Sequence, residues 1–220
     1  MIIEILTLFP EFYASILNRS IISRALKRGI VKVNLHDLRK FSSNKHNKVD
    51  DTPYGGGEGM VLQFPPIYDA IMKLKDDNTK VYLLSPQGKK YNHDFAMEMS
   101  KFKKIILICG YYEGVDSRVE KIIDAEISVG DYILTNGDIA SMLIVDSLIR
   151  LLPGVINKES VKKDTFYSGK IKYPQYTKPS SYKGYKVPEV LLSGDHEKIA
   201  EWRESKIKEI TEKKRPDLNK

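Results

Sequence analysis

Short apolar runs alternate with amphipathic segments along most of this 220-residue chain. The runs with the length and the β-branched content of strands are residues 2–8, 30–35, 81–84, 105–109 and 125–129. Between them, apolar positions recur at helical spacing in residues 10–28, 65–75, 93–102 and 116–124. Strands that alternate with helices predict an α/β domain with a mostly parallel sheet.

One further predicted helix, residues 138–152, is apolar nearly all round. A helix of this kind is expected to be buried on most sides. A sheet covers one face only, so a subunit interface is a candidate cover for another face.

The last part of the chain differs in composition. Residues 157–169 are polar and suit a hinge, residues 173–188 are rich in Tyr, Pro and Lys and predict irregular structure, and residues 196–214 predict a charged helix. Of the net charge of +7, residues 157–220 (16 Lys+Arg, 10 Asp+Glu) carry +6 and residues 1–156 (20 and 19) carry +1. A basic region of this kind indicates a polyanionic partner such as nucleic acid. A solvated, lysine-rich surface explains the charge equally well.

Composition also argues against several classes. No run approaches the roughly 18–20 apolar residues of a membrane helix, and the start has no basic region of a signal peptide. The single cysteine, Cys109, predicts no disulfide within the chain or to a partner and fits the cytoplasm. The His and Cys spacings predict no structural zinc.

The candidate chemistry lies in glycine-bearing loops at the ends of three predicted strands, residues 85–88, 108–118 and 128–138. Carboxyl ends of parallel strands meet at one edge of a sheet, where ligands bind. Glycines there let the backbone approach a ligand closely, so we expect a site built mostly of main chain. The glycine run 55–59 lacks the phosphate-loop pattern, and no Rossmann fingerprint is present.

Single polar residues are ambiguous on their own. Asp164 in a polar stretch reads as a solvated charge or a cap, and Arg150 follows Asp146 at salt-bridge spacing. Glu113 and Asp116 could cap the following helix.

Taken together, ten segments that follow one another along the chain resemble those of the bacterial tRNA (guanine-N1)-methyltransferases of the SPOUT class. The matching segments span nearly the whole chain: TLFPEF (7–12), VDDTPYGGGEGM (49–60), LLSPQG (83–88), CGYYEGVDSRV (109–119), SVGDYILTNGD (128–138), LIRLLPGV (148–155), DTFYSG (164–169), YPQYTKP (173–179), VPEVLLSGDH (187–196) and KRP (214–216).

The resemblance implies an α/β, parallel-sheet SPOUT methyltransferase fold with a trefoil knot in the C-terminal part of the main domain, and an obligate homodimer. It implies a knotted catalytic domain at 1–160, a flexible linker at 161–171, and a small, mostly helical, basic tRNA-binding domain at 172–220.

The implied reaction moves a methyl group from S-adenosyl-L-methionine to N1 of guanine 37 of tRNA, next to the anticodon. Asp164 would be the general base, and Arg150 would stabilise O6 or orient Asp164. Mg²⁺, which the family is reported to use, would have Glu113 as a candidate ligand. The resemblance assigns the methyl donor to Leu83, Leu84, Ser85, Pro86, Gly88, Gly110, Glu113, Val129, Gly130, Asp131, Tyr132, Ile133, Leu134 and Gly137.

Some positions depart from the family pattern. Tyr111 stands where a basic residue is usual, Asn136 replaces the first glycine of a pair, Ala140 replaces a common proline, and Glu58 stands where proline or alanine is usual. Two rival readings are a non-catalytic RNA-binding protein, based on the basic region, and a nucleotide-dependent oxidoreductase, which the missing fingerprint disfavours.

Overall fold

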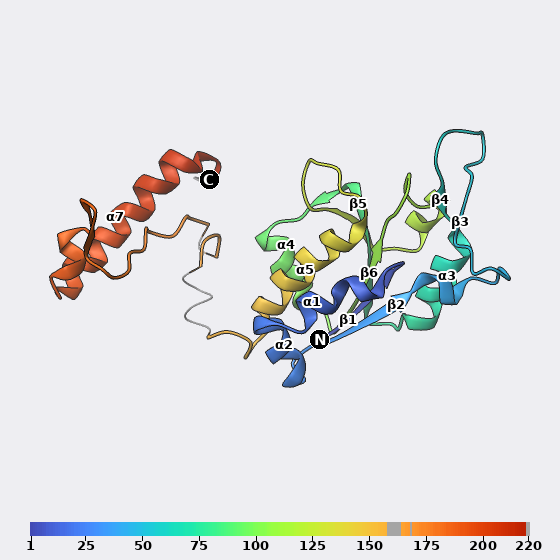
Figure 1. Ribbon diagram of the computed structural model, residues 1–220, viewed down its shortest axis with the longest axis horizontal. Coiled ribbons are helices and arrows are strands. Elements are labelled where there is room, and N and C mark those ends of the chain that lie inside the picture. Colours follow the sequence, from blue (N-terminus) through green and yellow to red (C-terminus); the bar gives the residue numbers. More distant parts are fainter. Residues whose placement is uncertain (158–163, 168, 219–220) are drawn as a thin grey trace. The chain divides into compact units, whose positions relative to one another are not determined.

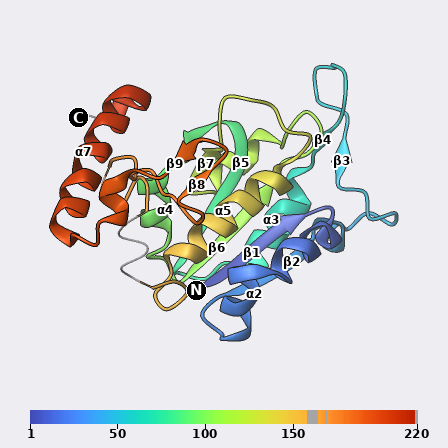
Figure 2. The same ribbon diagram turned by 60° about the vertical axis from the view of Figure 1, so that its left-hand side comes forward.

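A computed structural model describes residues 1–157, 164–167 and 169–218. These residues form two compact units, Met1–Ile156 and Asn157–Lys220. Each unit is described by itself, and both appear in Figures 1 and 2.

The first unit is built on a parallel sheet, which confirms the α/β prediction. Its strands run in the order β2-β1-β6-β5-β7, and each neighbouring pair is parallel. The strands are β1 (Ile2–Thr7), β2 (Lys32–Asp37), β5 (Thr79–Lys90), β6 (Lys104–Cys109) and β7 (Ala125–Ser128).

The central strands are buried almost without interruption, as expected for a sheet covered on both faces. Helix α5 (Gly137–Leu151) packs on the sheet beside α2 (Ser20–Lys27) and α4 (His93–Met99) (Figure 1). Helix α3 (Phe64–Leu74) packs against β1 and two 3-10 helices, Leu38–Phe41 and Ser117–Lys121.

The predicted helical segment 10–28 is helical over most of its length but is not one continuous helix. The segment forms a 3-10 helix (Pro10–Tyr13), a short α1 (Ala14–Leu17) and then α2. The chain breaks at Arg19, which is extended, and at Ser20, whose φ of 62° is left-handed. The segment 116–124 likewise forms the 3-10 helix Ser117–Lys121 rather than an α-helix.

Strand β5 runs past the predicted residues 81–84 to Lys90. A register shift between Leu84 and Lys89 lets its second half pair with β7. A Cβ on Gly88 would lie 2.4 Å from the backbone carbon of Glu126, so only glycine fits this crossing. The pairing folds the segment 85–88 over the end of β7.

Two short antiparallel strands of two residues each, β3 (Asp50–Asp51) and β4 (Val61–Leu62), flank the glycine-rich loop 52–60.

Helix α5 is only partly covered within a single chain. Ile144, Leu148 and Ile149 are fully buried, whereas Ile139 and Leu143 are 49% and 42% exposed. The expectation that this helix is buried on most sides is therefore not met by the sheet alone.

The second unit contains α7 (His196–Lys214), two further 3-10 helices (Glu189–Leu192 and Pro216–Leu218) and a small hairpin of β8 (Ser181–Tyr182) and β9 (Tyr185–Lys186). The predicted helix 196–214 is confirmed in full. The hairpin adds a short regular element to the expected irregular segment 173–188. Among the described residues, no helix is both long and apolar enough to cross a membrane.

Candidate functional site

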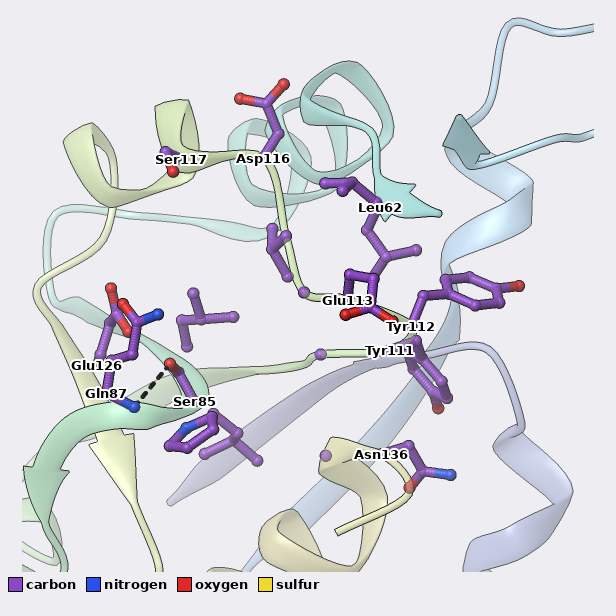
Figure 3. A pocket seen from close by; sticks show the side chains of 18 of the residues that line it. Leu62, Ser85, Gln87, Tyr111, Tyr112, Glu113, Asp116, Ser117, Glu126 and Asn136 are labelled. Atoms are coloured by element: carbon purple, nitrogen blue, oxygen red, sulfur yellow. Dashed lines mark hydrogen bonds between the residues drawn. The ribbon is translucent and has the colours of Figure 1, made fainter. Parts of the chain in front are cut away.

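A cavity of about 1210 Å³ opens at the carboxyl ends of β5, β6 and β7. Its walls come from residues 83–87 of β5, from the loops that follow β6 and β7, and from residues 51–54, 61–63 and 65. Figure 3 shows Ser85, Gln87 and Glu126 on one side of it and Tyr111, Tyr112 and Glu113 on the other. The two expected loops after β6 and β7 therefore meet at one edge of the sheet, and the third expected loop, residues 85–88, meets them there as part of β5.

Most residues assigned to the methyl donor by resemblance line this cavity. Gly88 and Asp131 are outside the lining. Gly88 lies in the crossing of β5 over β7, and Asp131 pairs with Lys90 at 2.6 Å. The others are Leu83, Leu84, Ser85, Pro86, Gly110, Glu113, Val129, Gly130, Tyr132, Ile133, Leu134 and Gly137.

Backbone contact between two loops forms part of the cavity wall. The Gly137 N–H donates to the Gly110 carbonyl at 2.8 Å. A Cβ on Gly137 would lie 2.8 Å from both the Cys109 Cα and the Gly110 nitrogen. The start of α5 can approach the end of β6 this closely only because residue 137 has no side chain.

Glu113 connects the cavity to the glycine-rich loop. Its N–H donates to the Met60 carbonyl at 3.0 Å. A Cβ on Gly59 would lie 2.5 Å from the Glu113 Cγ. Glu113 is thus held beside the cavity by the loop 52–60 and does not cap the following helix.

Asp116 does cap that helix, as expected, because its carboxylate accepts from the Arg118 N–H at 2.9 Å. The Arg118 side chain also donates to both carboxylate oxygens, from Nε to Oδ1 at 2.9 Å and from Nη2 to Oδ2 at 2.7 Å. These contacts lower the pKa of Asp116 below its ordinary value. The pair lies at the cavity rim, where Arg118 stacks 5.2 Å from the centre of the Phe64 ring.

Behind the cavity, Asp138 is buried and accepts several hydrogen bonds. Thr7 Oγ1 donates to its Oδ1 at 2.7 Å, Tyr13 donates to the same oxygen at 2.8 Å, and Tyr111 donates to Oδ2 at 2.5 Å. The Leu8 N–H in turn donates to the Tyr111 hydroxyl at 3.1 Å. Tyr111, at the position where the family usually has a basic residue, therefore anchors its loop to β1 and α5.

Burial keeps the donors of this cluster protonated. Burial is the main cause that raises the pKa of Tyr13 and of Tyr111 well above the ordinary tyrosine value. It also raises the pKa of the Cys109 thiol, which lies 3.4 Å from the Tyr13 hydroxyl. A thiol held neutral in this way is a poor nucleophile.

The two proposed catalytic residues are not cavity-lining residues. Arg150 is exposed in the last turn of α5, whereas Asn136 and Gly137, at the start of the helix, line the cavity. At 1.5 Å per residue, the ends of this helix are about 20 Å apart. Asp164 belongs to the second unit.

Around Glu113 and throughout the described parts of the chain, no group of three or more His, Cys, Asp and Glu side chains is arranged to hold a metal ion.

Sequence reasoning missed the Asp138 cluster. Its members come from β1, the first 3-10 helix, the loop after β6 and the start of α5. The available signal was an aspartate in the first turn of a mostly apolar helix. Asn136, a departure from the family pattern, caps that helix by accepting from the Asp138 N–H at 3.0 Å.

Comparison with known proteins gives a consistent result. The family model described as "tRNA (Guanine-1)-methyltransferase TrmD" matches residues 1–220. A tRNA (guanine-N(1)-)-methyltransferase of Aster yellows witches'-broom phytoplasma is 52% identical over 99% of this chain and 90% of its own length. Proteins of the same name from Clostridium tetani and Caldanaerobacter subterraneus are each 50% identical, over 99% and 100% of this chain and 92% of their own lengths.

Proposed function

Because the chain belongs to the tRNA (guanine-1)-methyltransferase family, we propose that it transfers a methyl group from S-adenosyl-L-methionine to N1 of guanine 37 of tRNA. The observation that carries this proposal is the cavity at the carboxyl ends of β5, β6 and β7, built from the loops that the family resemblance assigns to the methyl donor. We place the reaction in the cytoplasm because its substrate is tRNA.

The cavity suits an adenosine-bearing donor. Leu84, Ile133 and Leu134 line it and offer apolar contact, and Gly110 and Gly130 bring main chain to its surface. Gly110 and Gly137 line the cavity and have no side chain, so main chain forms this part of its wall. Gly88 shapes the segment 85–88 from outside the cavity. When bound, S-adenosylmethionine supplies a methyl group on a sulfonium sulfur; a nucleophile attacks the methyl carbon in line with the carbon–sulfur bond, and the sulfur leaves.

The chemistry at guanine needs two protein groups. N1 carries a proton and becomes a good nucleophile once that proton leaves. We propose that the Asp164 carboxylate accepts the N1 proton as the methyl group is transferred. The Arg150 guanidinium stabilises the negative charge that develops on O6, or orients Asp164. The proton ends on Asp164, and the sulfonium becomes a neutral thioether.

A homodimer would explain why Arg150 is distant from the cavity of its own chain. Arg150 lies on one exposed face of α5 together with Ile139, Leu143 and Asp146, at spacings of four, three and four residues. Burying the two exposed apolar side chains against a second copy would stabilise the pair. The same contact would bring Arg150 of one copy toward the cavity of the other.

The second unit has the composition of a tRNA-binding surface. Its hairpin presents Tyr182 and Tyr185, which are 62% and 84% exposed, beside Lys183 and Lys186. Aromatic rings can stack on bases, and lysines can neutralise phosphates. We propose that this unit binds the tRNA backbone.

Family membership also supports two proposals about the chain path. We propose that residues 1–160 form the knotted SPOUT domain. We further propose that residues 161–171 connect this domain to the tRNA-binding domain at 172–220; residues 161–163 and 168 lie outside those that the structure describes.

The central test is methyl transfer to a tRNA that carries GG at positions 36 and 37. The wild-type chain should transfer labelled methyl from S-adenosylmethionine to that guanine, and Asp164→Asn should lower kcat by about 10²–10⁴-fold. A tRNA with adenine at position 37 is the substrate control. Absence of transfer by the wild type, or full activity of Asp164→Asn, would refute the assignment.

A non-catalytic RNA-binding protein is the remaining rival, supported by the charge of +6 on residues 157–220. It predicts salt-sensitive tRNA binding with no affinity for S-adenosylmethionine. Calorimetric titration of the chain with S-adenosylmethionine separates the two readings.

A further inference from the structure

The second unit contains an unusual buried residue. Thr211 is the buried residue of α7, with 1% of its surface exposed, and it is polar. A buried hydroxyl needs a hydrogen-bond partner. The Thr211 Oγ1 accepts from the Ile171 N–H at 3.0 Å.

This contact ties α7 to the segment that carries Asp164. The Tyr167 N–H donates to the Asp164 carbonyl at 3.3 Å, and the Phe166 N–H donates to the Lys170 carbonyl at 3.2 Å. The Lys172 N–H donates to Thr165 Oγ1 at 3.3 Å. The backbone near Asp164 therefore closes into a turn, and Ile171 lies at the base of that turn.

A second contact joins the same turn to the end of α7. Arg215 lies directly after the helix, with its guanidinium 5.5 Å from the centre of the Phe166 ring. The Asp217 carboxylate holds that guanidinium through hydrogen bonds of 2.8 and 2.6 Å. Phe166 has a φ of 73°, which is costly for a bulky residue and persists only where surrounding contacts enforce it.

We propose that the C-terminal end of α7 holds the Asp164 turn in its working position, with Thr211 and Arg215 as positioning residues for the general base. This inference rests on the proposed role of Asp164. A general base must lie within hydrogen-bond reach of the proton that it accepts. Helix α7 and the base then move as one piece, so tRNA that docks on the second unit also places the base.

The full-length variant Thr211→Val tests the proposal, because valine keeps the shape of threonine and removes the acceptor. It should lower kcat for tRNA methylation by about 10–100-fold, the cost of misplacing a catalytic group by about 1 Å. KM for tRNA and the affinity for S-adenosylmethionine should stay unchanged. Hydrogen exchange at the Ile171 amide should accelerate.

Thr211→Ser keeps the hydroxyl, so its kcat should equal that of the wild type. Thr177→Val removes an exposed threonine of the same unit and should have no effect. Arg215→Gln changes a half-buried side chain, and it should lower kcat with KM unchanged even if Thr211→Val fails to fold. Arg215→Lys should recover part of the loss because it keeps a cation for the Phe166 ring.

An unchanged kcat in Thr211→Val, despite faster exchange at Ile171, would overturn the proposal. So would a loss that appears equally in KM for tRNA, because that result indicates a general defect of the unit. If Thr211→Val does not fold, an unchanged kcat in Arg215→Gln overturns it. Failure of the proposed function is distinguishable, because it would show as an inactive wild type or an active Asp164→Asn.

Discussion

Asp138 lies in the first turn of α5 with its carboxylate buried, so hydrogen-bond donors must compensate its charge. Thr7, Tyr13 and Tyr111 supply them from three separate segments. A side chain that only filled space at position 111 would leave one carboxylate oxygen without its tyrosine donor. Tyr111, which departs from the family pattern, therefore has a defined structural role as a hydrogen-bond donor to Asp138.

Tyr111→Phe is expected to lower the free energy of unfolding by about 1–3 kcal/mol, because it leaves a buried acceptor without that donor. Urea unfolding at pH 8 measures the change. Tyr112→Phe is the matched control, since Tyr112 is the next residue and is 55% exposed. Equal stability of the two variants would contradict the assigned role of Tyr111.

The same cluster predicts a pH dependence. Because burial raises the pKa of Tyr13 and Tyr111, the folded chain keeps protons that the unfolded chain loses above about pH 10. Stability from this source is present below that pH and is lost as the pH rises further. The loss between pH 8 and pH 10.5 should be smaller in Tyr111→Phe than in the wild type.

At the scale of elements, the buried strands could be predicted because their apolar runs are continuous and local. The extension of β5 to Lys90 could not, because the polar segment 85–90 is a strand only through pairing with β7. The break at Ser20 was also missed, since its left-handed φ leaves no trace in the apolar pattern. The cavity walls were located because glycines mark them, whereas the Asp138 cluster joins distant segments and has no local pattern.

Gly137→Ala tests the close approach of α5 to β6. The added methyl group would meet the backbone of Cys109 and Gly110 at 2.8 Å, so the two elements must separate. We expect a loss of about 1–3 kcal/mol in unfolding free energy, typical of an overpacked site. S-adenosylmethionine binding, measured by calorimetry, should weaken about tenfold or more, equivalent to at least 1.4 kcal/mol.

Gly110→Ala provides a graded comparison in the same wall, because its nearest non-neighbouring atom, the Leu84 carbonyl oxygen, would lie at 3.3 Å. Its unfolding free energy should fall less than that of Gly137→Ala. The reverse order would show that the contact at residue 137 does not control the spacing of α5 and β6.

At the scale of the whole molecule, the net charge of +6 lies on residues 157–220, the same residues that form the second compact unit. The periodicity of α5 also indicated a helix with more apolar surface than one sheet can cover. Which residues remain exposed depends on packing, and only the structure identified Ile139 and Leu143. Both lie on the same exposed face of α5 as Arg150, so the proposed dimer contact and the proposed catalytic residue share one face of the helix.

If each site combines the cavity of one copy with Arg150 of the other, two inactive variants should complement each other. Arg150→Ala should retain S-adenosylmethionine binding and lose about 10²–10³-fold in kcat, as for removal of a transition-state donor. Ser85→Trp should block the cavity that Ser85 lines. After subunit exchange, half of the dimers are mixed and each has one intact site, so activity should return to about a quarter of the wild-type rate.

Adding Leu143→Asp to both variants should abolish this recovery, because it places a charge on the apolar face of α5. Mixed dimers that form and stay inactive would show that Arg150 does not serve the partner's cavity.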